Sequence, residues 1–116
     1  MEIVEVSIAG LLKRCIFAKI KALMIYIITY NINTSIRDYT PFYEAIKRGC
    51  MSYYHVQEST WFVSCAERQD VKTMTSFLAN RLYPGDTIFI AELTDRTQVD
   101  GWITKDFWDW YRDNIG

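Results

Sequence analysis

The clearest strand in the sequence begins at Met24. Residues 24–30, "MIYIITY", are almost all apolar or aromatic and are rich in isoleucine and tyrosine, which favour strands. Because side chains alternate between the two faces of a strand, both faces of this one carry apolar or aromatic residues. One face is predicted to carry Tyr26, Ile28 and Tyr30, and the other Ile25, Ile27 and Thr29. The pattern therefore predicts a central strand that is covered on both sides.

The rest of the chain alternates between helical and extended patterns. Thr40 and Pro41 predict a helix start, with Thr40 as the N-cap, and Gly49 predicts its end. One apolar face is predicted for this helix, formed by Phe42, Tyr43 and Ile46. A hairpin is predicted within residues 52–64, with its turn at Gln57–Glu58. The remaining predicted elements are a helix over 67–82, a strand over 87–93 and a helix over 104–115.

This order of elements predicts an α+β fold. It reads as a ferredoxin-like βαββαβ antiparallel sheet with a C-terminal helix and an appended N-terminal segment. We expect one ferredoxin-like domain over residues 24–116, preceded by a basic N-terminal extension, residues 1–23, whose pattern allows a helix. In this arrangement both crossover helices lie on one sheet face. We therefore expect the other face to be covered by a second copy, which makes the protein a homodimer.

Composition and charge narrow the functional classes. The chain has 116 residues, 50% of them hydrophobic, and a net charge of −1, with a basic start and an acidic end. This distribution excludes a general nucleic-acid surface, so any contact with nucleic acid would be local. A single histidine, His55, and the absence of a Cys/His cluster exclude an ordinary structural zinc site, and we expect no cofactor.

Cysteine usage and hydropathy predict the location. The three cysteines, Cys15, Cys50 and Cys65, form no disulfide framework, which indicates a reducing compartment and a cytoplasmic protein. The most apolar stretch, residues 16–28, is too short to span a bilayer and is interrupted by Lys19 and Lys21. We therefore expect no association with a membrane.

Four stretches together resemble a known group of proteins. "YIITYNIN", "FYEAIK", "HVQESTWFV" and "IFIAELT" resemble small bacterial SinR-type proteins. These are in turn similar to the CRISPR-associated protein 2 family of dimeric, ferredoxin-like nucleases, and more remotely to the VapD ribonucleases. The resemblance covers residues 24–116. It implies a homodimer with a role in bacterial or mobile-element biology.

The end of the first strand departs from that family. Its members have an aspartate there, which is thought to bind a catalytic divalent metal, and this chain has Asn31. An amide oxygen can bind a hard cation but carries no charge, so the metal site would be weakened. We therefore expect a binding or interaction module, not an enzyme. The alternatives are an endoribonuclease using other residues, with Mg²⁺ only in that case, or a small-ligand (nucleotide) regulatory domain.

The loop that follows the first strand contains the candidate binding residues. Asn31, Asn33 and Arg37 could bind a nucleic-acid or nucleotide phosphate near the predicted helix start. The alternative is structural: the asparagines would end the strand in an Asx turn, and Arg37 would form a surface pair with Asp38. A protein is the other possible partner. The predicted binding residues are Tyr30, Asn31, Asn33 and Arg37.

His55 and Glu58 are the candidate catalytic residues. They lie in or beside the predicted hairpin turn, where a histidine and a carboxylate could act as an acid/base pair in RNA cleavage. The alternative is that His55 is a strand residue with local hydrogen bonds.

The aromatic residues of the predicted sheet allow two interpretations. They could form a base-stacking platform, or they could pack in the core or at a dimer interface, which the lack of flanking lysine and arginine favours. The residues concerned are Tyr26, Tyr30, Tyr54 and Trp61.

Overall fold

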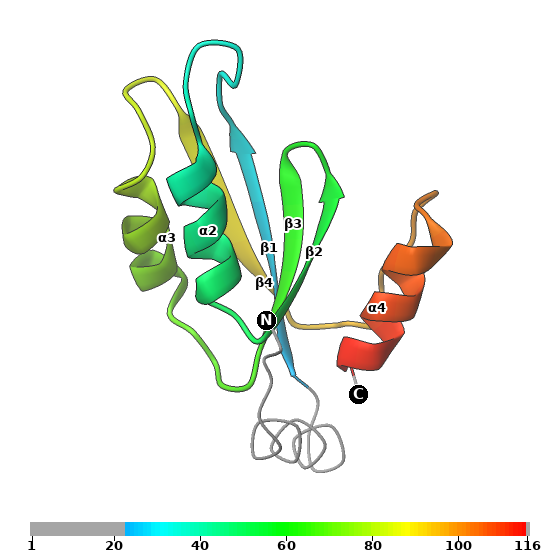
Figure 1. Ribbon diagram of the computed structural model, residues 1–116. Coiled ribbons are helices and arrows are strands. Elements are labelled where there is room, and N and C mark those ends of the chain that lie inside the picture. The colour runs from blue at the N-terminus through cyan, green and yellow to red at the C-terminus, as the bar shows by residue number, and fades with distance from the viewer. Residues whose placement is uncertain (1–22, 116) are drawn as a thin grey trace, which may run out of the picture.

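The computed structural model describes residues 23–115, which form an α+β fold with a four-stranded antiparallel sheet and three helices (Figure 1). The predicted N-terminal extension therefore lies outside the described residues, apart from Leu23. In chain order the elements are β1 (Met24–Asn31), α2 (Thr40–Arg48), β2 (Ser52–Gln57), β3 (Thr60–Cys65), α3 (Val71–Ala79), β4 (Thr87–Leu93) and α4 (Lys105–Ile115).

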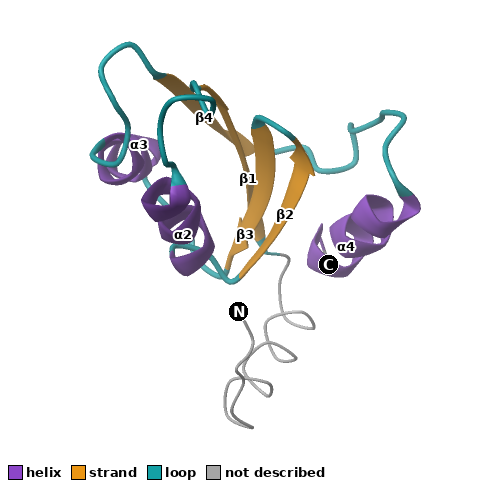
Figure 2. Ribbon diagram, turned by 45° about the horizontal axis from the view of Figure 1, so that its top comes forward, coloured by secondary structure: helices purple, strands orange, loops and turns teal. Residues whose placement is uncertain are grey.

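The sheet has the strand order β2-β3-β1-β4, and β1 pairs antiparallel with both β3 and β4. The prediction of a central first strand is therefore confirmed. Helices α2 and α3 lie on one face of the sheet, and α4 lies on the opposite side (Figure 2). None of the helices in the described part of the chain is long and apolar enough to cross a membrane.

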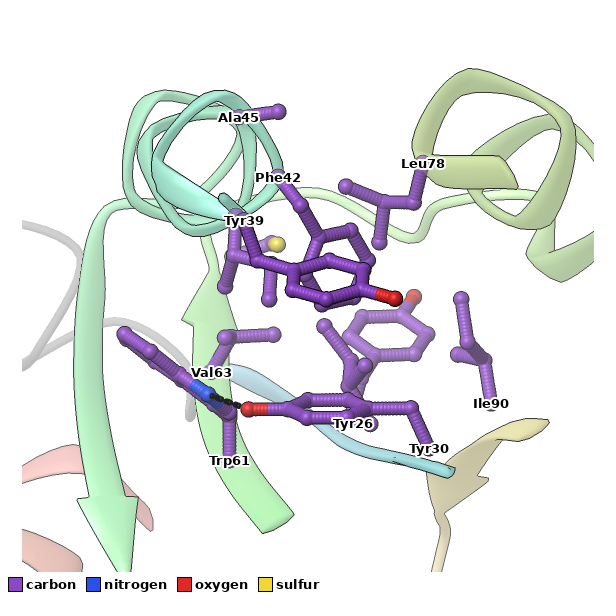
Figure 3. Packing of buried hydrophobic residues seen from close by; sticks show 12 residues of the cluster. Tyr26, Tyr30, Tyr39, Phe42, Ala45, Trp61, Val63, Leu78 and Ile90 are labelled. Atoms are coloured by element: carbon purple, nitrogen blue, oxygen red, sulfur yellow. Dashed lines mark hydrogen bonds between the residues drawn. The ribbon is translucent and has the colours of Figure 1, made fainter. Parts of the chain in front are cut away.

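The face of the sheet beneath α2 and α3, which we call the closed face, contains the larger core. Every second residue of β1 points into it, and Tyr26, Ile28 and Tyr30 are between 0% and 6% exposed. Phe42 of α2 is completely buried and packs edge-on against Tyr30, with 5.0 Å between the ring centroids (Figure 3). The apolar face predicted for this helix is therefore confirmed.

The opposite face contains a second, smaller core beneath α4. Ile25 and Phe62 of the sheet pack there against Phe107 and Tyr111 of the helix. The expectation that this face carries no helix was wrong. Helix α4 folds back over it, since burying its aromatic stripe against the apolar side of β1 removes both surfaces from water.

Polar contacts fix α4 in place. Ser64 is completely buried, and its hydroxyl donates to the side-chain oxygen of Asn114 at 2.8 Å. The amide nitrogen of Asn114 donates in turn to the carbonyl of Trp110, whose indole N–H donates to the hydroxyl of Ser52 at 2.7 Å. Buried polar groups that are all paired specify one docking position for the helix.

Several predicted boundaries were wrong by a few residues. Thr40 is the first residue of α2 and not its N-cap, because Tyr39 holds that position without a side-chain cap bond. Helix α3 begins later than the predicted 67–82, because the Asp70 carboxylate accepts from Thr73 N–H and caps the helix there, and it also ends earlier, at Ala79. The hairpin turn lies one residue later than predicted, at Glu58–Ser59.

Candidate functional site

The far end of β1 is where the sequence placed the candidate site. Asn31 is the last residue of the strand, lies opposite Thr87 of β4 and is exposed. Asn33 forms a local turn, because its side-chain oxygen accepts from Ser35 N–H at 3.2 Å and from the Ser35 hydroxyl at 2.6 Å. The Asx-turn interpretation of Asn33 therefore describes its geometry.

The start of α2 already holds a negative charge. The Asp38 carboxylate accepts from Thr40 N–H at 3.0 Å and from the Thr40 hydroxyl at 2.8 Å. These two hydrogen bonds, the backbone one first, lower the pKa of Asp38, so its carboxylate stays ionised. A phosphate at this helix end would meet that carboxylate, which weakens the predicted phosphate site.

Arg37 does not join the asparagines. Its guanidinium group lies over the Tyr83 ring, 4.6 Å from the ring centroid. The Tyr83 hydroxyl donates to the carbonyl of Asp38, so the loop and the segment before β4 support each other. Arg37 therefore makes a cation–π contact with Tyr83 and does not extend toward Asn31 and Asn33.

A hydrogen-bonded chain that the sequence did not reveal supports the same loop. The hydroxyl of Tyr39 accepts from Asn33 N–H and donates to the Asp86 carboxylate at 2.6 Å. The same carboxylate oxygen accepts from Tyr83 N–H at 2.8 Å. Burial, followed by the bond to Asp86, raises the pKa of Tyr39. Since 47 positions separate Tyr39 and Asp86 in the chain, no local pattern could have paired them.

His55 and Glu58 are neighbours, but their side chains do not form an acid/base pair. The His55 Nε2 atom is 2.9 Å from the backbone carbonyl oxygen of Glu58, not from its carboxylate. The imidazole ring also stacks on Trp61, with 4.2 Å between centroids and 15° between planes. Through these two contacts the imidazole ring of His55 stabilises the hairpin turn. The geometry therefore favours the structural alternative for His55.

Tyr30 joins β1 to this turn. Its hydroxyl accepts from the Trp61 indole N–H at 2.8 Å, the dashed bond in Figure 3, and donates to the carbonyl of Glu58 at 3.3 Å. Burial raises the pKa of Tyr30 to about 12, and the negative charge of Glu58 adds to the shift. The phenol therefore stays protonated at neutral pH and acts as a fixed donor and acceptor.

A polar pocket opens between the end of β1, helix α2 and the hairpin turn. We call it the strand-end pocket, and its volume is about 330 Å³. It unites the predicted residues Tyr30, Asn31 and Glu58, whereas Asn33, Arg37 and His55 do not line it. The lining residues are Tyr30, Asn31, Ile32, Thr34, Tyr43, Glu58 and Ser59. Thr34, Tyr43 and Ser59 were not predicted as site residues; for Tyr43 the sequence indicates only a place on the apolar face of its helix.

The four aromatic residues predicted for a base-stacking platform do not form one. Tyr26, Tyr30 and Trp61 are between 0% and 6% exposed, and they pack beneath α2 and α3. Tyr54 packs edge-on against Phe107 of α4. A base-stacking surface needs accessible ring faces, so the packing interpretation of these residues is the one that the structure favours.

Two further kinds of reactive group can be assessed within residues 23–115. No group of three or more histidine, cysteine, aspartate or glutamate side chains converges there as a metal site would require. Burial raises the pKa of the Cys50 thiol to about 12 and that of Cys65 to about 11. Thiols with such pKa values are poor nucleophiles at neutral pH.

Comparison of the chain with protein-family models, curated proteins and solved structures gives no match in any of the three. The resemblance to SinR-type proteins and to the CRISPR-associated protein 2 family is neither supported nor contradicted by this result, and it stays a prediction.

Proposed function

We propose that the protein is a ferredoxin-like binding module that acts as a homodimer and lacks metal-dependent nuclease activity. The fold part of this proposal rests on the element order βαββαβ and on the strand order β2-β3-β1-β4 with antiparallel neighbours. The cytoplasmic location, the bacterial or mobile-element setting and the relation to the CRISPR-associated protein 2 family belong to the same proposal.

The observation that carries the proposal is an apolar surface that α4 covers only in part. We call it the open patch; its exposed centre is Phe89 of β4, and its partly buried surroundings are Ala91 of β4 and Thr29 and Ile27 of β1. Ile27 also packs against the core beneath α4, so the patch begins where the cover of α4 ends. Phe89 is 65% exposed, although it lies on a regular strand. None of the four side chains is charged, and an uncharged apolar surface can contact its own copy across a two-fold axis.

Asn31 lies at the end of this surface. Side chains alternate along a strand, so Asn31 is on the same side of β1 as Ile27 and Thr29. A face-to-face dimer would bring two amides toward its axis, where two carboxylates would be needed to hold a divalent ion for water activation. The neutral amide supports binding without metal-dependent cleavage. The contacts of His55 give no support to the endoribonuclease alternative.

Oligomeric state tests the dimer directly. Sedimentation velocity should show a dimer for the wild type, whereas Phe89→Glu should be monomeric, because two buried carboxylates would repel each other at the interface. Phe77→Glu is the matched control, since Phe77 of α3 is also exposed, at 43%, but lies on the other side of the sheet. A monomeric wild type at high concentration, or equal effects of the two substitutions, would contradict the dimer.

Nuclease assays test the other half of the proposal. Labelled RNA and DNA should survive incubation with the wild type in the presence of Mg²⁺ or Mn²⁺. Asn31→Asp should increase the affinity for Mn²⁺, since it adds a charged oxygen ligand. Cleavage by the wild type that requires a metal and persists in His55→Ala would overturn the proposal, whereas loss of cleavage in His55→Ala would support the endoribonuclease alternative.

A further inference from the structure

The strand-end pocket has the wrong charge for a phosphate. Among its lining residues Glu58 is the one charged side chain, and the part of the chain that the structure describes contributes no lysine or arginine to the lining. Proteins bind phosphate groups through cationic side chains, through free backbone N–H groups, or through both. The partner chemistry of the proposed binding module can therefore be defined more closely at this pocket.

We propose that the strand-end pocket binds an organic cation, a guanidinium or ammonium group, between the Glu58 carboxylate and the aromatic wall formed by Tyr43. A cation of this kind is carried by a basic side chain of a partner protein or by a free amine. The inference rests on the proposed function, because it supplies the ligand chemistry of the binding module.

The aromatic wall is rigid. The Tyr43 ring stacks on Trp61 at 6.1 Å and 26°, and its centroid is 6.4 Å from that of Tyr30. The hydrogen bond between the Trp61 indole and the Tyr30 hydroxyl fixes these neighbours. An aromatic ring held in this way offers a cation its negative face without paying for side-chain ordering at the time of binding.

The carboxylate of Glu58 can still accept hydrogen bonds from a ligand. Glu58 is exposed at the hairpin turn, and none of the ion pairs among residues 23–115 includes it. Its backbone is fixed, since the carbonyl oxygen accepts from Tyr30 and lies within hydrogen-bonding distance of His55. A guanidinium group matches a carboxylate with two parallel hydrogen bonds, and the Asn31 amide and Thr34 hydroxyl supply further acceptors.

The position of the pocket suits a ligand on a partner protein as well as a free one. Asn31 belongs both to the pocket lining and to the side of β1 that carries the open patch. The pocket is formed by one chain, so its binding can be measured whether or not the dimer forms. Failure of the dimer and failure of cation binding are therefore separate results.

The test is a titration of the full chain with cations, in which binding is monitored through the NMR signals of Tyr43 and Asn31. Agmatine represents the free cation, and acetyl-Gly-Arg-Gly-amide represents a basic side chain; the citrulline peptide is the uncharged isostere. We expect saturable shifts with at least one of the two cations. Tighter binding of the peptide would assign the ligand to a partner protein, and tighter binding of agmatine would assign it to a free amine. We expect binding of the citrulline peptide to be about tenfold weaker than that of the arginine peptide, because the charge-assisted bonds are lost.

Matched substitutions locate the binding. Glu58→Gln should weaken cation binding about tenfold, and Tyr43→Leu should weaken it a few-fold. Glu44→Gln should leave it unchanged, since Glu44 is an exposed glutamate of α2 that pairs with Lys47 away from the pocket. Because the Glu58 side chain is exposed, far-UV circular dichroism of Glu58→Gln should match that of the wild type.

Several results would overturn the inference. These include no shift at millimolar cation, equal binding of the citrulline peptide, unchanged affinity in Glu58→Gln, and binding of inorganic phosphate or AMP at the same signals. Displacement of both cations by Mg²⁺ or Mn²⁺, with tighter binding of the metal, would also overturn it, because the occupant would then be a divalent ion.

Discussion

The two faces of the sheet are built from the same strands but completed in different ways. On the closed face two helices bury Tyr26, Ile28 and Tyr30 along the length of β1. On the opposite face one helix covers Ile25 and Phe62 and stops short of Phe89, which is 65% exposed. An apolar strand face therefore does not reveal what covers it. The closed face is complete within one chain, whereas the other face leaves Phe89 exposed.

The largest expected effect comes from breaking the closed face. Phe42→Ala removes a completely buried ring that packs against Tyr30. Urea denaturation should show a loss of about 3–5 kcal/mol, from the lost burial and the cavity left behind. Phe77→Ala, at a partly exposed position of α3, is the control and should cost much less. Similar losses for both would mean that the closed face is not the main source of stability.

The next effect tests how α4 is attached to the opposite face. Asn114→Ala leaves the buried Ser64 hydroxyl without its acceptor and should cost about 1–3 kcal/mol. Adding Ser64→Ala should recover part of this loss, because the unpaired group is then removed too. Thermal unfolding of the two single variants and the double variant measures the coupling. Strictly additive losses would show that the bond does not hold the helix.

A smaller effect concerns acid stability on the closed face. Two hydrogen bonds from Thr73, the side-chain one first, lower the pKa of the exposed Asp70 carboxylate. A lowered folded-state pKa stabilises the protein above the unfolded-state pKa, and this stabilisation is lost as the pH falls through the folded-state value. Asp70→Asn keeps an N-cap acceptor but does not titrate, so its stability should fall less steeply in acid.

The urea midpoint of unfolding, measured at a series of pH values from neutral to acid, would show how the stabilities of the wild type and Asp70→Asn differ in their pH dependence. Asp113→Asn, at an exposed position of α4, is the control and should follow the wild-type curve. If the urea midpoint of Asp70→Asn fell with pH as steeply as that of the wild type, the Asp70 cap would not contribute to acid unfolding.

The smallest effect should come from the open patch within a single chain. Phe89→Ala should change the stability of the monomer by no more than about 0.5 kcal/mol, because the ring is largely exposed. The measurement is made at a protein concentration low enough to dissociate any dimer. A loss close to that of Phe42→Ala would show that Phe89 belongs to the core of one chain, and the contrast between the two faces would fail.

Local patterns predicted the elements well, and long-range geometry explains what they missed. Alternation along β1 assigned Tyr26 and Ile28 to one face and Ile25 to the other, as the structure confirms. The return of α4 over the sheet depends on the path of residues 94–104, which no local pattern determines. The shorter α3 could have been predicted, since Asp70 with Thr73 is a recognisable capping pair.

The candidate site was predicted only in part, for the same reason. Tyr30, Asn31 and Glu58 do line one pocket, and the turn at Asn33 has a local sequence signal. The contact of Arg37 with Tyr83 joins segments that are distant in sequence and could not be read from either one. The proximity of His55 and Glu58 was expected, but the partner of His55 is a backbone carbonyl, which sequence does not specify.

The position of β1 at the centre of the sheet has a consequence for how the chain is made. Both of its neighbours are synthesised after it, and β4 begins 56 positions beyond the end of β1 (87 − 31). At roughly 5–20 residues per second, a ribosome needs several seconds to produce that stretch. During this interval the most apolar strand leaves the exit tunnel without its second partner. The nascent chain is therefore most exposed to ribosome-associated chaperones and to aggregation before Thr87–Leu93 emerges.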